Sequence, residues 1–165
     1  MATRFEPLLS AFNDAGVDYV LVGGLAVVAH GRVRATMDMD FVLRLEKPNI
    51  LRAMAALESL GYVPRAPVVA TQFADDDLRQ RWIRDKGMVV FSMMHADATK
   101  PTVDLFPEYP LDFERLWRNS EIMRVGASVA RICGLDDLIE LKRRAGRPRD
   151  IDDIRALEVI RDASK

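Results

Sequence analysis

Residues 22–43 read VGGLAVVAHGRVRATMDMDFVL and hold two adjacent glycines near one end and two aspartates near the other. The apolar run VDYVLV at residues 17–22 predicts a buried strand that the glycines end. The next segment, LAVVAH, predicts a short helix closed by Gly31. A second strand is expected over residues 39–45. This stretch therefore predicts a strand, a short helix and another strand in succession, a local pattern of mixed α/β domains.

Asp38 and Asp40 flank a single methionine at the start of the second predicted strand. Residues i and i+2 of a strand project from the same face, and a rise of ~3.3 Å per residue puts their Cα atoms ~6.5 Å apart. Two carboxylates this close repel each other unless a positive charge lies between them. Such oxygen ligands suit Mg²⁺ or Mn²⁺, which also keep waters and bind substrate phosphates. An Asp-x-Asp motif also occurs where one aspartate merely caps a strand and faces water, so the motif alone leaves both interpretations open.

Gly23 and Gly24 lie where the first predicted strand meets the short helix. Backbone N–H groups at a helix N-terminus form an anion site, and glycine lets a phosphate approach the backbone closely. A tight turn that simply requires glycine is the alternative. Because a carboxylate pair follows on the next strand, the glycines favour a site for a metal-bound nucleotide.

Asp104 is the candidate for a third carboxylate, because it lies in the middle of the apolar strand TVDLF at residues 102–106. A carboxylate inside an apolar strand is costly unless it is paired or binds a metal. Sites for two metal ions take ligands from more than one side, so a neighbouring strand is the expected source. Asp97, in the preceding HADATK segment, is predicted to be a solvated turn residue.

Composition and charge favour one soluble globular domain over residues 1–165. Hydrophobic residues make up 49% of the chain and charged residues 30%, and the net charge of −1 gives no global basic field for nucleic acid. A local patch from Arg79, Arg81, Arg84 and residues 142–149 would be needed to hold a tRNA end.

Cys133 is the only cysteine, which excludes an intramolecular disulfide and predicts a buried, inert thiol. No apolar run approaches the ~18 residues of a transmembrane helix, and the first residues lack a signal-peptide pattern. No membrane partner is expected, and the predicted location is the cytoplasm.

The rest of the chain completes an α/β (α+β) pattern, with helices before, between and after strands. Helices are predicted at residues 5–16, 48–60, 113–117, 136–144 and 150–161, further strands at 88–94 and 102–106, and a strand or a hairpin around Gly126 at 122–132. Asp150 is the expected N-cap of the last helix, with Asp153 in its first turn. Residues 62–87 predict irregular structure, and their charged part, residues 74–86, predicts a solvated loop or, alternatively, a mobile flap.

Three short segments together resemble the signature of the DNA polymerase β-like nucleotidyltransferase superfamily. They are Gly23-Gly24, Arg34-Ala35-Thr36 and Asp38-Met39-Asp40. The segment DLIELKRRAGRPRDIDDI at residues 137–154 is similar to the lysine-containing helical motif of the small prokaryotic branch, which includes abortive-infection toxin-like nucleotidyltransferases. The resemblance implies the nucleotidyltransferase fold, a mixed β-sheet flanked by helices, with its core at residues 17–106 and C-terminal helices at 134–165.

The resemblance also implies a role for each matched acidic residue. Asp38 and Asp40 would bridge two Mg²⁺ (or Mn²⁺) ions. Asp104 would complete the site of the catalytic metal and help to deprotonate the attacking hydroxyl.

A second group of residues is implied to bind the nucleoside triphosphate (NTP). These residues are Gly23, Gly24, Arg34, Thr36, Lys142 and Arg147. The glycines would hold the β- and γ-phosphates, and Lys142 would contact phosphates with Arg147 as a second cation. The alternative for Lys142 is a solvated position in a basic run. Arg34 and Thr36 would orient the substrate or Asp38, although Thr36 equally suits a purely local role beside the strand.

The implied activity is Mg²⁺-dependent transfer of a nucleoside monophosphate (NMP) from an NTP to an acceptor hydroxyl. The acceptor is RNA or tRNA, a protein side chain, or a small molecule such as an aminoglycoside. This chemistry requires no covalent enzyme nucleophile, so His30 and His95 are predicted to be structural. The alternative function is a non-catalytic nucleotide- or protein-binding module of the same fold, for example a toxin–antitoxin component with a cognate antitoxin as its partner.

Overall fold

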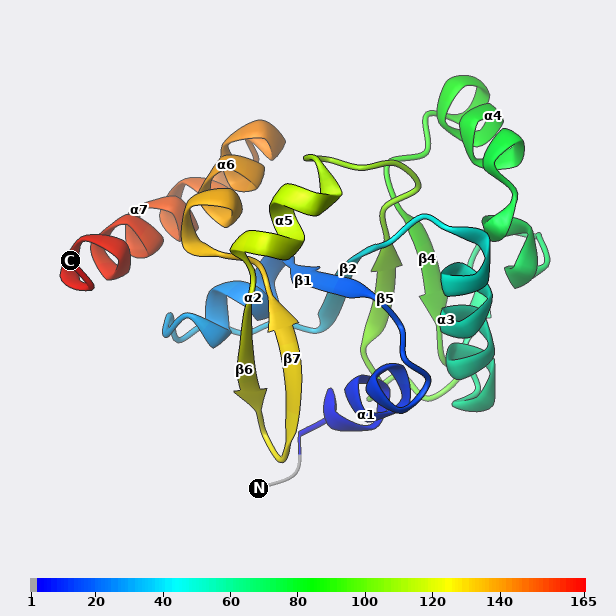
Figure 1. Ribbon diagram of the computed structural model, residues 1–165, viewed down its shortest axis with the longest axis horizontal. Helices are drawn as coiled ribbons and strands as arrows, with labels where there is room; N and C mark the ends of the chain where they lie inside the picture. Colours follow the sequence, from blue (N-terminus) through cyan, green and yellow to red (C-terminus); the bar gives the residue numbers. More distant parts are fainter. Residues whose placement is uncertain (1–2) are drawn as a thin grey trace.

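A mixed β-sheet forms the centre of the computed structural model, which describes residues 3–165 (Figure 1). Within that range its strands are β1 (Tyr19–Val22), β2 (Asp38–Leu43), β3 (Val63–Pro64), β4 (Phe91–Met94), β5 (Thr102–Leu105), β6 (Glu121–Val125) and β7 (Ser128–Ile132). Their order in the sheet is β3-β4-β5-β2-β1-β7-β6. The pairs β2–β5 and β1–β7 are parallel, and the other neighbours are antiparallel. The predicted mixed sheet is therefore confirmed.

Helices cover the sheet and complete the chain. They are α1 (Glu6–Asp14), α2 (Gly23–Ala29), α3 (Lys47–Ser59), the short 3-10 helix η1 (Ala70–Ala74), α4 (Asp76–Lys86), α5 (Phe113–Asn119), α6 (Leu135–Ala145) and α7 (Pro148–Ala163). The helices α1 and α3 contact each other beside the sheet, whereas α2, α6 and α7 gather near β1 (Figure 1). The predicted α/β class, a mixed sheet flanked by helices and followed by C-terminal helices, is confirmed. No helix within residues 3–165 has the length and apolar character needed to span a membrane.

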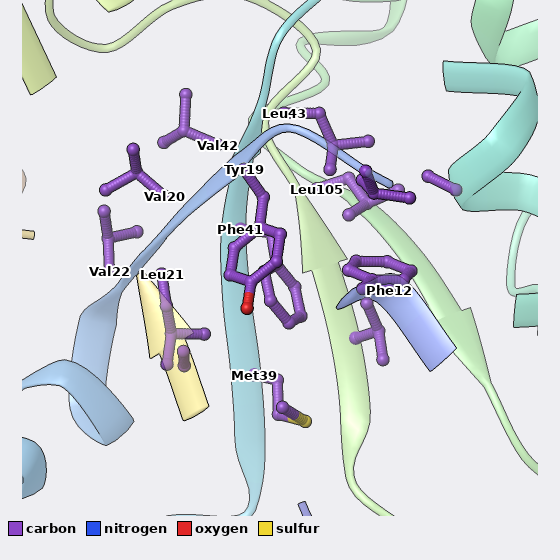
Figure 2. Close-up of a cluster of buried hydrophobic side chains, with 14 of the residues drawn as sticks. Phe12, Tyr19, Val20, Leu21, Val22, Met39, Phe41, Val42, Leu43 and Leu105 are labelled. Atoms are coloured by element: carbon purple, nitrogen blue, oxygen red, sulfur yellow. The ribbon is translucent and has the colours of Figure 1, made fainter. Parts of the chain in front are cut away.

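Alternation of side chains along β2 separates the hydrophobic core from a polar face. Met39 and Phe41 are fully buried, and the two aspartates of the strand are partly exposed. The ring of Phe41 packs against Phe12 of α1, with centroids 5.0 Å apart, and against Tyr19 of β1 at 5.2 Å (Figure 2). The strand β5 alternates in the same way. Because the same strands fill the core and carry the aspartates, core packing fixes where the carboxylates stand.

Residues 62–87 are folded, so the prediction of irregular structure there is wrong. The segment contains β3, η1 and α4, and its charged part is the helix α4 rather than a loop or flap. The Asp75 carboxylate accepts a hydrogen bond from the Leu78 N–H at 3.0 Å, and Gly87 ends the helix with a φ of 62°. Caps at both ends therefore define this helix, whose largely charged composition conceals the helical period.

Arg79 of α4 is buried and is not available to hold a tRNA end, contrary to the prediction. Its guanidinium donates hydrogen bonds to the carbonyl oxygens of Phe73 at 2.7 Å and Pro107 at 3.2 Å. It also pairs with Asp76 at 2.9 Å. The hydrogen bonds of this arginine therefore connect α4 to η1 and to the segment after β5.

Several element boundaries differ from the predictions, and those of β4 and α7 differ by more than their length alone. The strand β4 begins at Phe91 rather than at residue 88. The helix α7 begins at Pro148, so Asp150 is not its N-cap but a fully buried residue of its first turn. Proline suits the first helical position because its fixed φ is helical and its missing N–H is not needed there. The hairpin predicted around Gly126 is confirmed as β6–β7.

Candidate active site

Asp40 and Asp104 stand side by side on adjacent parallel strands. In the β2–β5 pairing Asp40 is opposite Asp104, and Asp38 is opposite Thr102. Residues two apart on a strand share a face, so the three aspartates project from the same side of the sheet. The structure thus places on one face of the sheet the three carboxylates that the sequence singles out, although Asp104 is distant along the chain.

Gly23 leaves the space that the Asp40 carboxylate occupies. Val22 at the end of β1 pairs with Asp40, so α2 begins directly beside this aspartate. A Cβ atom on residue 23 would lie 2.2 Å from Asp40 Oδ2, and the φ of 69° is in the left-handed region. A Cβ atom on Gly24 would lie 3.0 Å from Thr36 Oγ1. Both glycines border the site, and residue 23 has no room for a side chain.

Burial and mutual repulsion make the carboxylates of this face costly to ionise. Burial, together with the charges of Asp104 and Asp38, raises the pKa of Asp40 to about 7. Burial also raises the pKa of Asp104, although the Ser92 hydroxyl lowers it by donating a hydrogen bond of 2.5 Å to Asp104 Oδ1. A cation placed among these groups would favour their charged forms.

The chemistry of this donor set fits a hard divalent cation. Among residues 3–165 none of the three aspartates takes part in an ion pair. In the same range no three Asp, Glu, His or Cys side chains are gathered closely enough to form a metal site by themselves. Mg²⁺ usually keeps several waters and binds through one or two carboxylates plus substrate phosphates. The residues present therefore suit a cation whose remaining ligands are water and substrate.

A cleft of about 500 Å³ opens beside the three aspartates. Every residue predicted for the site borders it: Gly23, Gly24, Arg34, Thr36, Asp38, Asp40, Asp104, Lys142 and Arg147. Arg144 and Arg149 add two more cations to its lining. Its apolar lining comes from Val22, Val89, Val90, Phe106, Pro110, Leu138, Leu141 and Ala145. The cleft therefore combines a carboxylate wall from the sheet with basic residues mainly from α6, α7 and the turn between them.

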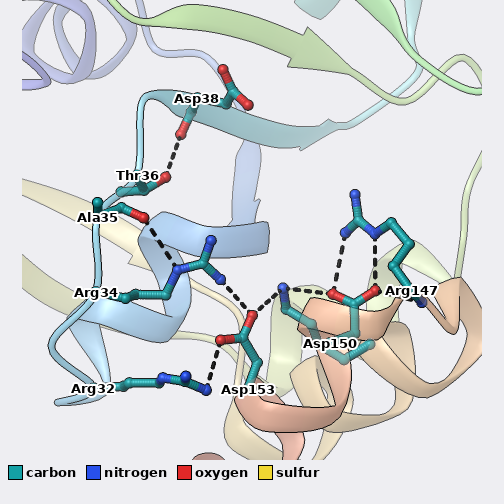
Figure 3. A network of polar contacts seen from close by, with 9 residues as sticks. Arg32, Arg34, Ala35, Thr36, Asp38, Arg147, Asp150 and Asp153 are labelled. Atoms are coloured by element: carbon teal, nitrogen blue, oxygen red, sulfur yellow. Dashed lines mark hydrogen bonds and ion pairs between the residues drawn. The ribbon is translucent and has the colours of Figure 1, made fainter.

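Lys142 is buried in an ion-pair network, so the alternative of a solvated helix position is wrong. Its Nζ atom lies 3.1 Å from Asp150 Oδ1 and 2.9 Å from Asp153 Oδ2. Asp153 also pairs with Arg34, and Arg147 donates to Asp150 Oδ2 through Nε at 2.9 Å (Figure 3). The predicted cations Arg34, Lys142 and Arg147 therefore lie in one network held by two buried carboxylates.

Thr36 and Arg34 have local contacts as well. The Thr36 hydroxyl donates to the Asp38 carbonyl oxygen at 3.4 Å, and Arg34 Nε donates to the Ala35 carbonyl oxygen at 3.3 Å (Figure 3). The contact of Thr36 matches the purely local role left open for it beside the strand.

Sequence reasoning missed three residues that contact the site residues from outside the cleft lining, besides Arg144 and Arg149 of the lining itself. Ser92 is one, since nothing in a short strand marks a serine as the partner of an aspartate on the next strand. Asp150 and Asp153 are the others, which the sequence predicted as helix-capping and first-turn residues. Asp150 and Asp153 are three residues apart on a helix, so their side chains lie on the same face. A lysine eight residues before Asp150 is the sequence feature that indicates a shared ion-pair partner.

The two histidines and the cysteine have the structural surroundings that the sequence predicted. His30 Nε2 lies 2.7 Å from the Cys133 carbonyl oxygen, and His95 packs against Tyr62 with ring centroids 5.3 Å apart. Cys133 is fully buried, and burial raises the pKa of its thiol.

Structures with the same fold are known. A lincomycin-bound crystal structure of the lincosamide antibiotic adenylyltransferase LnuA is 16% identical, with a TM-score of 0.65, over 97% of this chain and 98% of that chain. The crystal structure of ANT(2")-Ia in complex with adenylyl-2"-tobramycin is 17% identical, with a TM-score of 0.60, over 96% and 93%. A solution structure of the antibiotic-resistance factor ANT(2'')-Ia is 16% identical, with a TM-score of 0.61, over 97% and 88%. At these identities the likeness establishes a common fold.

A family model gives the classification. No curated protein sequence matches the chain. Residues 5–164 match the model described as "Nucleotidyltransferase of unknown function (DUF6036)", a range that includes every predicted site residue. The nucleotidyltransferase superfamily expected from the glycine and aspartate motifs is thereby confirmed. The chain belongs to the DUF6036 family of nucleotidyltransferases.

Proposed function

We propose that this chain transfers an NMP from an NTP to a hydroxyl group of a small-molecule acceptor. The observation that carries the proposal is the composition of the cleft, in which Asp38, Asp40 and Asp104 face a space also lined by Lys142 and Arg147. Carboxylates for a cation and basic side chains for phosphates are the two parts that a site for a metal-bound triphosphate needs.

Asp38, Asp40 and Asp104 are the residues that would hold Mg²⁺ or Mn²⁺ in this proposal. When bound, the cation neutralises the charge of the triphosphate and stabilises the pyrophosphate that leaves. The raised pKa of Asp40 supports this assignment. The charged form of this carboxylate is unfavourable in the protein alone, and a neighbouring positive charge would stabilise it.

The basic residues of the cleft bind and orient the triphosphate. Arg34, Lys142 and Arg147 are held by buried carboxylates, whereas Arg144 and Arg149 are exposed beside them. Arginine offers a planar fork of donors that suits phosphate oxygens, and lysine offers a compact point charge. Gly23 and Gly24 line the same cleft, where Gly23 leaves room for the Asp40 carboxylate and Gly24 lies beside Arg34.

In this proposal Asp104 accepts the proton of the acceptor hydroxyl. The acceptor oxygen forms a bond to the α-phosphorus, the bond from the α-phosphorus to the bridging oxygen breaks, and pyrophosphate leaves with the electron pair of that bond. Asp104 stands opposite Asp40 on the adjacent strand, which puts a carboxylate that can accept a proton beside the proposed cation. The hydrogen bond from Ser92 leaves Oδ2 as the oxygen free of that contact.

A small molecule is the acceptor class that the cleft favours. Apolar residues lie on the Asp104 side of the cleft, because Val89 and Val90 precede β4 and Phe106 follows β5. Two structures of the same fold contain small molecules of this class: the lincosamide adenylyltransferase LnuA has bound lincomycin, and ANT(2")-Ia is in complex with adenylyl-2"-tobramycin. The chain also has a net charge of −1, so it lacks the basic field that recruits long nucleic acids.

Transfer of label from an α-³²P-NTP in the presence of Mg²⁺ tests the proposal. The four NTPs are each incubated with lincomycin, tobramycin, total RNA or a protein lysate as acceptor. We expect label on a small molecule and a loss of about two to four orders of magnitude in rate for Asp104→Asn. Asp14→Asn is the matched control, because it removes the same charge from an exposed position on α1.

Each other outcome has a definite meaning. Label on RNA or protein overturns the choice of acceptor class but keeps the reaction. NTP binding without transfer to any acceptor overturns the reaction and favours a non-catalytic nucleotide-binding module, such as a toxin–antitoxin component.

A further inference from the structure

We infer that Asp153 is a positioning residue of the phosphate site, whose buried carboxylate holds the Arg34 guanidinium and the Lys142 ammonium together at the cleft. The inference rests on the proposed function, because it assigns to these two cations the binding of the triphosphate. Asp153 itself does not line the cleft.

The contacts of Asp153 join three separate segments of the chain (Figure 3). Its Oδ2 atom accepts hydrogen bonds from Arg34 Nη1 at 2.5 Å and from Lys142 Nζ at 2.9 Å. Its Oδ1 atom lies 2.9 Å from Arg32 Nη1. These partners come from the loop before β2 and from α6, and Asp153 itself belongs to α7. A single carboxylate that is only 1% exposed therefore connects the loop leading to Asp38 with both C-terminal helices.

Arg34 is oriented so that one of its nitrogens is left for a ligand. Nη1 donates to Asp153 and Nε donates to the Ala35 carbonyl oxygen. Among residues 3–165 Nη2 has no hydrogen-bond partner, and it lies 3.3 Å from the point where a Cβ atom of Gly24 would be. Because the guanidinium is planar, fixing two nitrogens fixes the direction of the third. Asp153 thus directs the remaining donor of Arg34 towards the glycine segment.

The charge of the network explains why the bound cations still attract an anion. Asp150 and Asp153 are the only acidic members, against Arg32, Arg34, Lys142 and Arg147. The network itself therefore has more positive than negative side chains, and it stands across the cleft from the three aspartates. Without the Asp153 carboxylate, two cations that share one oxygen would repel each other and move apart.

The inference can be tested by the binding of inorganic tripolyphosphate in the presence of Mg²⁺. Isothermal titration calorimetry on the full chain measures this binding, and the test does not require the preferred nucleotide base to be known. We expect Asp153→Asn to raise the Kd at least tenfold while circular dichroism shows a folded chain. Asp152→Asn is the matched control, because Asp152 is exposed on the same helix and the two variants have equal net charge. Its Kd should stay within twofold of the wild-type value.

A double-mutant cycle separates positioning from a general structural effect. If Asp153 acts through Arg34, the effect of Asp153→Asn on the Kd should be at least threefold smaller in the Arg34→Gln background. Additive effects of the two changes would overturn the inference. If Asp153→Asn does not fold, Asp153→Glu decides, since it keeps the charge but displaces the carboxylate, and its Kd should rise at least threefold.

The outcomes distinguish the inference from the proposed function. A wild-type chain that binds no tripolyphosphate overturns the phosphate site and with it the proposed function. If the wild-type chain binds tripolyphosphate and the Asp153→Asn or Asp153→Glu variant has the same Kd, only the role of Asp153 is overturned.

Discussion

At the scale of single residues, the environment of Asp40 opposes its own charge. Burial and the charges of Asp104 and Asp38 raise its pKa to about 7, from an ordinary value near 4. Between these two pH values the folded chain holds a proton that the unfolded chain has released. The free energy of unfolding therefore falls as pH rises from about 4 to about 7.

Replacement of Asp40 by asparagine should consequently stabilise the metal-free chain. At pH 8 in EDTA we expect Asp40→Asn to raise the free energy of unfolding by roughly 2–4 kcal/mol, and at pH 4 the two chains should be nearly equal. Urea unfolding at both pH values measures the difference. Added Mg²⁺ should raise the midpoint of the wild type more than that of the variant, and a variant less stable than the wild type at pH 8 would contradict the expectation.

Gly23 allows a second prediction at this scale. Gly23→Ala should destabilise the chain by more than ~3 kcal/mol and abolish nucleotide transfer, because its Cβ would meet the Asp40 carboxylate at 2.2 Å. Gly16→Ala is the control, since its φ of 67° is similar and no atom lies within 4 Å of its Cβ position. That control should lose only the ~1 kcal/mol of left-handed backbone strain in the same urea titration. Equal losses would show that the contact with Asp40 is unimportant.

At the scale of elements, α4 is a helix that hydrophobic periodicity does not predict. Arg79 is its only fully buried side chain, so no apolar stripe marks the helix in the sequence. The cap residues Asp75 and Gly87 mark its ends instead. The strands β2 and β5 are the opposite case, because alternation of apolar and acidic residues predicts both the strand and the face of each aspartate.

The N-cap of α4 can be tested directly. Asp75→Ala should lower the free energy of unfolding by ~1 kcal/mol, because the Leu78 N–H loses its acceptor. Asp77→Ala, an exposed position in the first turn of the helix, should cost less than ~0.5 kcal/mol. The two values come from chemical denaturation at pH 7, and an Asp75 effect no larger than that of Asp77 would argue against the cap.

The pair α6–α7 gives a prediction for acid conditions. Burial raises the pKa of Asp150, but hydrogen bonds from Arg147 and Lys142 outweigh it and lower the pKa to about 2. A depressed folded-state pKa stabilises the chain fully above pH 4, and this stability is lost as pH falls through 2. Asp150→Asn should therefore cost ~2 kcal/mol at pH 7 and little at pH 2, as followed by circular dichroism. If Asp150→Asn lowered the free energy of unfolding equally at pH 7 and pH 2, the loss would come from packing rather than from the charge of Asp150.

At the scale of the whole molecule, local sequence patterns predicted most of the elements outside residues 62–87, whereas the pairing of distant segments determines the site. The alternation around Met39 gives the common face of Asp38 and Asp40, and the apolar flanks of Asp104 mark it as unusual. No local pattern encodes the register that sets Asp40 opposite Asp104, since it results from how the whole sheet pairs. The contact of Arg34 with Asp153 spans 119 positions of the chain, and it requires the packing of α6 against α7 and α2.

That long-range contact has a consequence for the order in which the chain is made. A ribosome completes the strands with Asp38, Asp40 and Asp104 well before it reaches residue 153. Until α7 emerges, Lys142 and Arg34 lack their shared partner, and the nascent chain has the carboxylate wall without an ordered basic wall. The proposed phosphate site therefore depends on α7, and a chain that ends before residue 153 should lack the ordered pair of Arg34 and Lys142.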